Sequence, residues 1–475
     1  MISDELKYHI WQSFGHIPTA EQQRAADVFA SFMTDRDSRS VMILRGSAGT
    51  GKTTLAGAIV RAMGILKQKM VLLAPTGRAA KVFALNAGTP AYTIHRRIYR
   101  QKTAADFGTF NLNVNLQRDT LFIVDEASMI SNQGFSDMAF GSGRLLDDLM
   151  EFVYSGDNNC RMMLIGDKAQ LPPVGEDESP ALSASELRSY GMNVYQADLN
   201  EVLRQSQESG ILYNATCIRN LLFTTLPKVH LSFPDIQIVP GDELIESLAN
   251  SYSRVGRDDT IVITRSNKRA IIYNRGIRRT VLDREDELCR GDQLMIVKNN
   301  YFWLSANGQE PKANNPISFL ANGDIAIVQR VRNVHELYGF RFGEITLQLP
   351  DYDNFELTAT VLLDTLISES PSLTREQQNQ LYEKVMEDYA DIPSKAERFK
   401  RLRQDRYYNA LQVKFAYAVT CHKAQGGQWS HVYIDQGYMT DDMLSSDYIH
   451  WLYTAFTRAT SRLFLVNWPK SQIME

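Results

Sequence analysis

The sequence has few cysteines and no long apolar run. Its four cysteines are scattered and include no C-x-x-C pair, a pattern that argues against a disulfide framework or a zinc site and fits a reducing cytosol. No apolar run approaches the roughly 20 residues of a membrane span. The first residues, MISDELKYHIWQSFGH, are acidic and aromatic, so we expect no signal peptide. We therefore predict a cytoplasmic protein without a membrane partner, in the host cytoplasm if a phage encodes it.

A strong charge of one sign is also lacking. The chain has 51 Lys and Arg residues against 55 Asp and Glu residues, a formal net charge of −4. A nucleic-acid partner would therefore have to be held in a local groove, because the protein has no overall basic character. A content of 44% hydrophobic and 22% charged residues is typical of a globular protein. The length predicts about three domains.

The stretch LRGSAGTGKTTLAG, residues 44–57, carries the clearest chemical signal. An apolar run that reads as a strand precedes it, and a helical pattern follows, so the spacing G-x-x-x-x-G-K-T stands where a phosphate-binding loop requires it. We expect Lys52 to reach the β- and γ-phosphates of a nucleoside triphosphate and the Thr53 hydroxyl to bind Mg²⁺. The alternative is an ordinary Gly-rich turn. The residues expected to hold the nucleotide here are Gly46, Ala48, Gly49, Thr50, Gly51, Lys52, Thr53 and Thr54.

Two further groups of polar residues follow apolar strands. Asp125 and Glu126 end the run TLFIVDEAS, and Gln170 follows the run RMMLIGD. In an enzyme with a phosphate-binding loop, the aspartate holds Mg²⁺ and the glutamate orients and deprotonates the attacking water. The Gln170 amide is then placed to sense the γ-phosphate. Without the loop, Asp125 and Glu126 read as a solvated acidic pair and Gln170 as a capping or turn residue.

The pattern of apolar runs divides the chain into segments. Residues 1–204 alternate continuous apolar strands with helical stretches, as in a parallel sheet covered on both faces. A polar stretch at about 97–117 interrupts this pattern and predicts a protruding hairpin, with Phe107 and Phe110 as possible aromatic tips. The α/β pattern resumes over 205–290 and 415–475. Residues 291–414 read as a small β-barrel followed by charged helices, inserted into the second α/β domain.

Eight further short motifs follow one another along the chain. They are PTAEQ (18–22), APTGRAAK (74–81), TIH (93–95), DEAS (125–128), GDKAQLPPV (166–174), LNEVLRQ (199–205), VTCHKAQG (419–426) and YTAFTRA (453–459). In this order, together with the phosphate loop, they resemble the motifs of superfamily 1 helicases. The resemblance is to the 5′-to-3′ branch with the Dda and RecD-like enzymes, and it runs across nearly the whole chain.

This resemblance implies an α/β fold with two RecA-like motor domains. The first, residues 1–204, would carry the hairpin; the second, residues 205–290 and 415–475, would carry an SH3-like barrel and helical projection at 291–414. The resemblance also implies site residues. Gln22 would read adenine, and the catalytic set would be Lys52, Asp125, Glu126, Gln170, Arg204 and Arg458. Single-stranded DNA would be contacted by Pro75, Thr76, Thr93, His95, Thr420, His422 and Lys423.

The function implied is an ATP-dependent DNA helicase that moves 5′ to 3′ on single-stranded DNA with ATP and Mg²⁺ as cofactors. Expected partners are single-stranded DNA and single-strand/duplex junctions, with single-strand-binding or replication and repair proteins as further candidates; the motor is expected to act as a monomer. Two other interpretations stay open. One is an RNA helicase or a remodeller that strips proteins from nucleic acid. The other is a nucleotide-switched binding protein, which would not need the complete hydrolytic set of residues.

Overall fold

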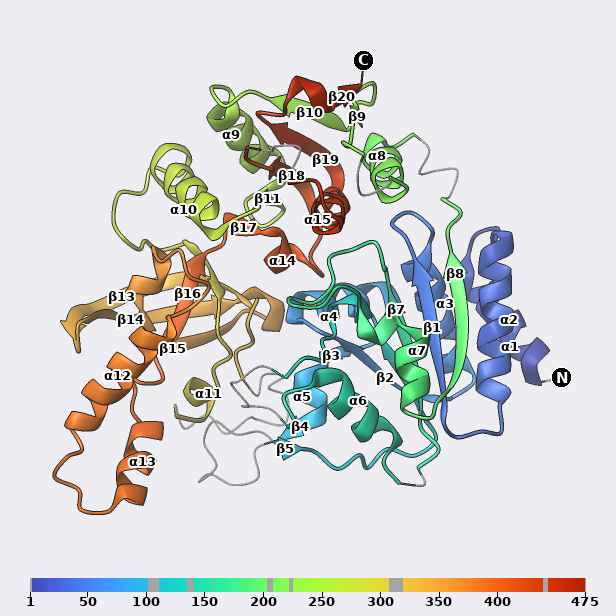
Figure 1. The fold of residues 1–475 in the computed structure, drawn as a ribbon, viewed down its shortest axis with the longest axis horizontal. Coiled ribbons are helices and arrows are strands. Elements are labelled where there is room, and N and C mark those ends of the chain that lie inside the picture. The colour runs from blue at the N-terminus through green and yellow to red at the C-terminus, as the bar shows by residue number, and fades with distance from the viewer. Residues whose placement is uncertain are drawn as a thin grey trace. The chain divides into compact units, whose positions relative to one another are not determined.

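A computed structural model of the protein describes residues 2–100, 111–134, 141–156, 158–202, 208–221, 225–306, 319–438 and 443–474. These residues form two compact units (Figure 1). Unit 1 contains the described residues up to Gly241 together with those from Ala424 onward, and unit 2 contains those from Asp242 to Lys423.

A six-stranded sheet organises unit 1. All of its strands pair in parallel, in the order β3-β2-β6-β7-β1-β8. Its central strands are fully buried, which explains why each reads as a continuous apolar run in the sequence. The strands are β1 (Ser40–Gly46), β2 (Lys69–Ala74), β3 (Ala91–Thr93), β6 (Thr120–Val124), β7 (Arg161–Gly166) and β8 (Asn193–Leu199).

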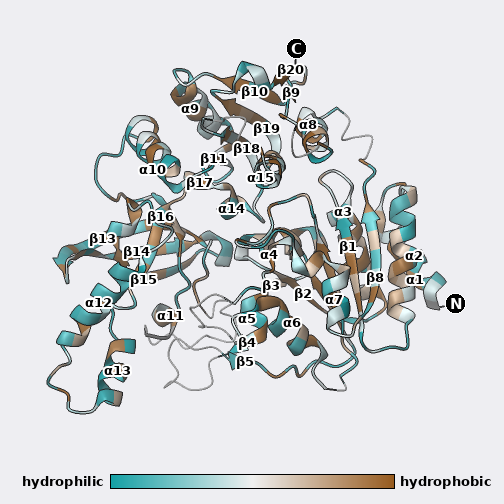
Figure 2. Cartoon of the chain, viewed as in Figure 1, coloured by the Kyte–Doolittle hydropathy of each residue, from teal (hydrophilic) through white to brown (hydrophobic). Residues whose placement is uncertain are grey.

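Helices precede the first strand and lie between later strands along the chain, and they bury their apolar sides against the sheet. Apolar side chains of α1, α2 and α3 form one core cluster with side chains of β1 and β7. Figure 2 shows the apolar strands in brown and the polar residues of the surrounding helices in teal. The helices are α1 (Ile2–Phe14), α2 (Ala20–Thr34), α3 (Lys52–Ile65), α4 (Gly77–Ala87), α5 (Ile94–Ile98), α6 (Leu145–Tyr154) and α7 (Ala184–Ser189).

A two-stranded ribbon stands where the sequence predicts a hairpin. β4 (Tyr99–Arg100) and β5 (Asn111–Leu112) pair antiparallel, with Tyr99 opposite Leu112 and Arg100 opposite Asn111. The base of a hairpin is therefore present. Its expected tip, with Phe107 and Phe110, lies outside the described residues.

The rest of unit 1 contains a second group of parallel strands. β10 pairs with β19, and β19 pairs with β18, all in parallel. The short strands β9 and β20 form a separate parallel pair. These elements are α8 (Gly210–Arg219), β9 (Val229–His230), β10 (Ile236–Val239), β18 (Trp429–Asp435), α15 (Ser446–Phe456), β19 (Ala459–Val466) and β20 (Ile473–Met474).

Unit 2 combines a short α/β segment with a closed five-stranded barrel. In the α/β segment, β11 (Thr260–Thr264) pairs in parallel with β17 (Ala418–Thr420), accompanied by α9 (Leu244–Val255), α10 (Asn267–Gly276) and α14 (Cys421–Ala424). The barrel strands are β12 (Gln293–Ile296), β13 (Ile325–Leu337), β14 (Phe340–Leu349), β15 (Phe355–Leu362) and β16 (Leu411–Phe415).

A helical projection extends from the barrel, as the charged sequence after residue 370 predicts. α12 (Arg375–Glu387) and α13 (Lys395–Arg403) follow β15, and α11 (Phe302–Ala306) follows β12. Leu381 and Val385 of α12 and Leu402 of α13 join a core cluster with apolar residues of β14 and β15. These few apolar side chains fasten helices that are otherwise polar to the barrel.

The fold class predicted from the sequence is confirmed. Parallel sheets of the RecA-like type and an inserted barrel with helices are all present. The predicted domain boundaries at 204, 290 and 414 stay predictions, because strands of the expected second motor domain belong to both compact units. In the part of the chain that the structure describes, no helix is both long and apolar enough to cross a membrane.

A buried ion cluster holds the barrel to the helix that precedes it. Asp292, fully buried, accepts hydrogen bonds from Arg278 (2.9 Å), Arg284 (2.6 Å) and the hydroxyl of Tyr417 (2.9 Å). The Cys289 N–H donates to the same carboxylate at 2.7 Å. Two arginines that are themselves largely buried thus depend on one carboxylate.

We expect Asp292→Asn to lower the free energy of unfolding by about 3–5 kcal/mol, because it leaves buried guanidinium groups without their counter-charge. Urea denaturation followed by circular dichroism measures the loss. Glu387→Gln is the matched control: the Lys384–Glu387 pair (3.0 Å) lies on the surface of the same unit, and exposed pairs contribute about 1 kcal/mol or less. Equal losses in the two variants would contradict a supporting role for the buried cluster.

Candidate nucleotide and nucleic-acid sites

The predicted phosphate loop lies between β1 and α3. β1 ends at Gly46, and α3 begins at Lys52 with Gly51 as its N-cap residue. Gly49 and Gly51 have φ angles of 77° and 76°, a left-handed conformation that glycine adopts without strain. Because Gly51 has no side chain to cap the helix, the first N–H groups of α3 are suited to an anion, as in other phosphate loops. Lys52 Nζ donates to the Gly46 carbonyl at 2.9 Å, so the lysine side chain folds back toward the start of the loop.

Gln22 ties this loop to α2. Its amide nitrogen donates to the Thr50 carbonyl at 3.0 Å, and its amide oxygen accepts from the Thr19 N–H at 3.0 Å. The Thr19 hydroxyl in turn accepts from the Gln22 N–H, which completes a capping box at the start of α2. Gln22 is fully buried. Both ends of its side chain are therefore bonded within the protein, an arrangement suited to anchoring the loop.

The acidic pair lies at the end of β6, as predicted. Asp125 and Glu126 follow Val124, the last residue of this strand. Glu126 has φ 51° and ψ 38°, a left-handed conformation that is uncommon for a residue with a side chain and often found at functional sites. Burial, reinforced by the charge of Glu126, raises the pKa of Asp125 to about 7, against the opposing effect of Lys52. The electrostatic effects of Lys52 and Glu126 on Asp125 place the three side chains in one neighbourhood.

The residues present fit the predicted magnesium ion. A buried carboxylate with a raised pKa is stabilised in its charged form by a cation, and Asp125 and Thr53 offer the oxygen ligands that Mg²⁺ prefers. Thr53 lies in the first turn of α3. Within the described residues, no group of three or more His, Cys, Asp or Glu side chains could hold a metal ion. The candidate site therefore rests on these two side chains.

Gln170 lies in the loop after β7, and β7 is paired with β1 in the sheet. The residue is 6% exposed, and its side-chain oxygen is buried without a hydrogen-bond partner among the described residues. A buried amide oxygen with no partner is uncommon and points to a functional position. Arg204, the predicted catalytic arginine of LNEVLRQ, lies outside the described residues.

Arg458 follows α15 and is almost fully buried. Its guanidinium donates to the Thr454 carbonyl, the Gly427 carbonyl and the Thr457 hydroxyl, each at 3.2 Å. Three of its donors are thus held by neighbouring loop and helix groups. Tyr453, which begins the motif YTAFTRA, lies on α15 and is a site residue that the motif pattern does not predict. Its hydroxyl accepts a hydrogen bond from Ala48 in the phosphate loop.

Two predicted DNA contacts lie at neighbouring strand ends of unit 1. Thr76 caps α4 just after β2, and Thr93 ends β3 and caps α5. Their hydroxyls accept from the N–H groups of Ala79 and Arg96, at 3.2 and 3.3 Å. Since β2 and β3 pair in parallel, both helix N-termini lie on one edge of the sheet. Such helix starts favour phosphate oxygens. Pro75 directly precedes Thr76 and lies on the same edge.

The third predicted DNA contact of this group, His95, is uncharged at neutral pH. Burial lowers its pKa to about 4, and its ring packs against Tyr99 with the centroids 5.7 Å apart. A contact of His95 with nucleic acid would therefore be a hydrogen bond or a stacking contact rather than an ion pair.

The segment after α14 packs against the start of α4. A side chain at Gly426 would approach the Thr76 hydroxyl to 3.1 Å and the Ala79 Cβ to 3.0 Å, so a residue without a side chain is needed there. Arg78 covers the ring of Trp429 at 4.1 Å and donates to the Gln428 carbonyl at 3.0 Å. This segment thus contacts both the predicted DNA-binding helix and, through the Gly427 carbonyl, Arg458.

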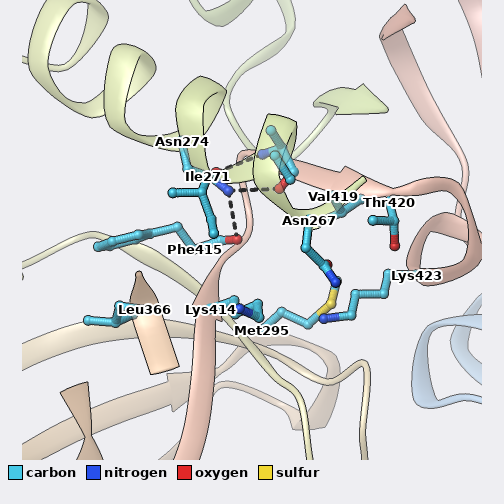
Figure 3. A pocket seen from close by; sticks show the side chains of 12 residues that line it. Asn267, Ile271, Asn274, Met295, Leu366, Lys414, Phe415, Val419, Thr420 and Lys423 are labelled. Carbon is cyan, nitrogen blue, oxygen red and sulfur yellow. Dashed lines mark hydrogen bonds between the residues drawn. The ribbon is translucent and has the colours of Figure 1, made fainter. Parts of the chain in front are cut away.

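The remaining predicted DNA contacts, Thr420, His422 and Lys423, lie in unit 2. Thr420 and Lys423 line a cavity of about 20 Å³ together with Lys414 and Asn267 (Figure 3). Burial, and for Lys423 also the charge of Lys414, lowers the pKa of both lysines to about 8. Lys414 donates to carbonyl oxygens of Thr365 and Ser368. Lys423 Nζ is buried and has no hydrogen-bond partner in the described part of the chain.

Two segments of the chain match models of known protein families. Residues 19–219 match the model of an AAA domain, and residues 415–466 match the UvrD-like helicase C-terminal domain. The chain belongs to the superfamily 1 helicases. Use of a nucleotide comes with this family, in agreement with the phosphate loop.

Two relatives of this chain are helicases of the RecD-like and Dda-like branch of superfamily 1. The ATP-dependent RecD2 DNA helicase of Deinococcus radiodurans is 29% identical over 161 residues, which are 33% of this chain and 20% of that protein. The ATP-dependent DNA helicase dda of Enterobacteria phage T4 is 27% identical over 198 residues, which are 39% of each. The chain therefore matches less than half the length of these two relatives.

Solved structures of Pif1 helicases align with nearly the whole superfamily 1 chain. One is Pif1 from Bacteroides in complex with ADP-AlF3 and single-stranded DNA. It covers 97% of this chain and 95% of that one, with a TM-score of 0.47 and 16% identity.

The two roles considered for Gln22 predict different results for Gln22→Ala. Loss of an anchor should weaken the binding of ATP and GTP by the same factor, about tenfold for one buried hydrogen bond, whereas loss of an adenine contact should weaken ATP binding alone. From the bonds to Thr50 and Thr19 we expect the first result. Titration with fluorescent ATP and GTP analogues measures both affinities. Gln23→Ala, on the exposed side of the same helix turn, is the control.

Proposed function

We propose that this protein is an ATP-dependent DNA helicase that moves 5′ to 3′ on single-stranded DNA and couples hydrolysis to closure of its motor domains and to duplex unwinding. One observation carries the proposal. The adjacent parallel strands β6, β7 and β1 end in the acidic pair, the Gln170 loop and the phosphate loop. Parallel strands put these three segments on one edge of the sheet, where phosphoryl transfer needs them.

In the proposed reaction, each polar residue of this edge has one task. Lys52 and the start of α3 bind the β- and γ-phosphates of ATP. Asp125 and Thr53 would hold Mg²⁺, and the bound ion would neutralise phosphate charge. Glu126 orients the attacking water and accepts its proton, and Gln170 contacts the γ-phosphoryl group. Arg204 and Arg458 stabilise the charge that develops in the transition state.

The single strand is proposed to be held through its phosphates. Thr76 and Thr93 present two helix N-termini on one sheet edge, next to Pro75 and His95. Thr420, His422 and Lys423 supply hydroxyl, imidazole and amine groups from unit 2. Phosphate contacts with little base readout suit a motor that must accept any sequence. The hairpin at 97–117 is proposed to separate the strands at a junction.

The contact of residues 426–429 with α4 suggests how the two sites communicate. Arg458 donates to the Gly427 carbonyl, and Gly426 packs against the Thr76 hydroxyl. A change at the nucleotide that moves Arg458 would therefore act on the helix that carries a proposed DNA contact.

We further propose that the motor acts as a monomer in the cytoplasm and meets single-strand-binding or replication and repair proteins there.

Two variants separate binding from chemistry. Lys52→Ala should abolish ATP hydrolysis, because it removes the cation at the phosphates. Glu126→Gln should retain ATP and DNA binding while turnover falls by about 10²–10⁴-fold, because it keeps the shape of the side chain and removes the base. A phosphate-release assay with single-stranded DNA, single-stranded RNA or neither measures turnover and tests the RNA alternative.

Lys69→Ala is the control for these variants, since Lys69 is exposed at the opposite end of the sheet, where β2 begins. Near-normal hydrolysis by Lys52→Ala would refute the nucleotide site. Loss of ATP binding in Glu126→Gln would refute the role given to Glu126. Wild-type protein that binds ATP without turnover would favour a nucleotide switch.

Polarity and strand separation are tested together with two partial duplexes, one with a 5′ tail and one with a 3′ tail. We expect strand release only from the 5′-tailed duplex. Opening a base-pair step costs on average about 1.4 kcal/mol of stacking, well within the free energy of one ATP per step. Shortening residues 103–113 should impair release and spare DNA-stimulated ATPase, because none of the nucleotide-site motifs lies there. Release from the 3′ tail alone would reverse the proposed polarity, and normal unwinding by the shortened chain would exclude the hairpin as the wedge.

A further inference from the structure

We propose that Tyr453 is a positioning residue for ATP hydrolysis, which aligns the phosphate loop with the loop that carries Gln170 and with the helix that leads to Arg458. The proposal rests on the ATPase activity proposed above. The Tyr453 hydroxyl accepts a hydrogen bond from the Ala48 N–H at 2.9 Å and donates one to Asp167 Oδ2 at 2.6 Å. It therefore joins the loop after β1 to the loop after β7.

The chemistry of this hydroxyl suits a fixed bridge. Tyr453 is 1% exposed and Asp167 is 3% exposed. Burial, reinforced by the negative charge of Asp167, raises the pKa of Tyr453 well above its ordinary value. The phenol therefore stays protonated and can accept from Ala48 while it donates to Asp167. A buried carboxylate that accepts a short hydrogen bond from a hydroxyl forms one of the stronger side-chain contacts.

Two further residues of α15, His450 and Thr454, contact the same loop after β7. The Thr454 hydroxyl accepts from the Leu171 N–H at 2.8 Å, and His450 Nδ1 lies 2.9 Å from the Ala169 carbonyl. Positions 450, 453 and 454 are spaced i, i+3 and i+4, so they share one face of the helix. Asp167 Oδ1 accepts from the Ala169 N–H at 2.9 Å, which shapes the turn from within. Gln170 therefore stands in a turn held on both sides of it.

The same helix leads directly to Arg458. Arg458 Nε donates to the Thr454 carbonyl at 3.2 Å, one residue beyond Tyr453. A shift of α15 relative to the phosphate loop would therefore move the guanidinium and the Gln170 loop together. Among the contacts described for α15, the Tyr453 hydroxyl is the one that reaches the phosphate loop. Its loss should disturb the alignment of groups that act in the transition state more than the binding of ATP.

Tyr453→Phe keeps the ring and removes the bridge. We expect kcat for DNA-stimulated ATP hydrolysis to fall about tenfold, with KM for ATP changed less than about twofold. Binding of ADP with aluminium fluoride, a mimic of the transition state, should weaken about tenfold, while binding of ADP alone stays close to that of the wild type. A loss of stability alone would not separate these two ligands.

Tyr448→Phe is the matched control. Tyr448 is equally buried on the same helix, and its hydroxyl donates to Gln436 at 2.7 Å and accepts from Gln472 at 3.2 Å, away from the phosphate loop. We expect Tyr448→Phe to keep wild-type kcat. Thermal unfolding of both variants monitors the fold. If Tyr453→Phe does not fold, Asp167→Asn breaks the other end of the bridge and should give the same loss of kcat.

The proposal is overturned by wild-type kcat in folded Tyr453→Phe, by equal losses in the two tyrosine variants, or by a change confined to KM. Wild-type kcat in Asp167→Asn overturns it if that variant has to be used. These outcomes are distinct from failure of the proposed function. If the wild-type protein hydrolyses no ATP with or without single-stranded DNA, the ATPase assignment itself fails. If the wild type is active and Tyr453→Phe matches it, only the positioning role is lost.

Discussion

Parallel pairing of β6, β7 and β1 is the constraint on which the candidate nucleotide site depends. Three chain segments far apart in sequence, beginning at Gly46, Asp125 and Asp167, meet because parallel neighbours end at the same edge of a sheet. These strands are buried on both faces, so their register is fixed by the apolar core. The strand pairing therefore brings the polar residues that follow these strands to one edge of the sheet.

Buried polar groups concentrate around this edge. Asp125 with its raised pKa, Gln170 and the Tyr453–Asp167 bridge lie on the loops that follow these strands or contact them. The amide oxygen of Gln170 has no hydrogen-bond partner among the described residues. Such groups lower stability unless a partner or ligand compensates them. Their presence beside the candidate phosphate loop is consistent with the proposed binding of charged ligands. The buried Asp292 cluster in unit 2 differs, since its carboxylate is fully paired with arginines, and its role is structural.

The elements of the fold could largely be predicted from the sequence. Continuous apolar runs identified β1, β2, β6 and β7, and alternating runs identified strands of the barrel. Local spacing sufficed because each element buries its own apolar residues. The compact units were harder to foresee, since strands of the expected second motor domain fall in both of them. Contacts between distant segments decide that grouping, and periodicity carries no information about them.

The candidate site shows the same difference between features set by local sequence and features set by contacts between distant segments. The sequence alone determined the phosphate loop, the acidic pair and the order of the motifs, because the chemistry of each resides in residues close together along the chain. The partners of those residues, by contrast, depend on the folded chain. It engaged both ends of the Gln22 amide, left His95 uncharged and brought the Tyr453 hydroxyl to Ala48 across 405 residues. Hydrogen bonding and burial depend on what surrounds a side chain, and those surroundings come from segments that only the folded chain brings together.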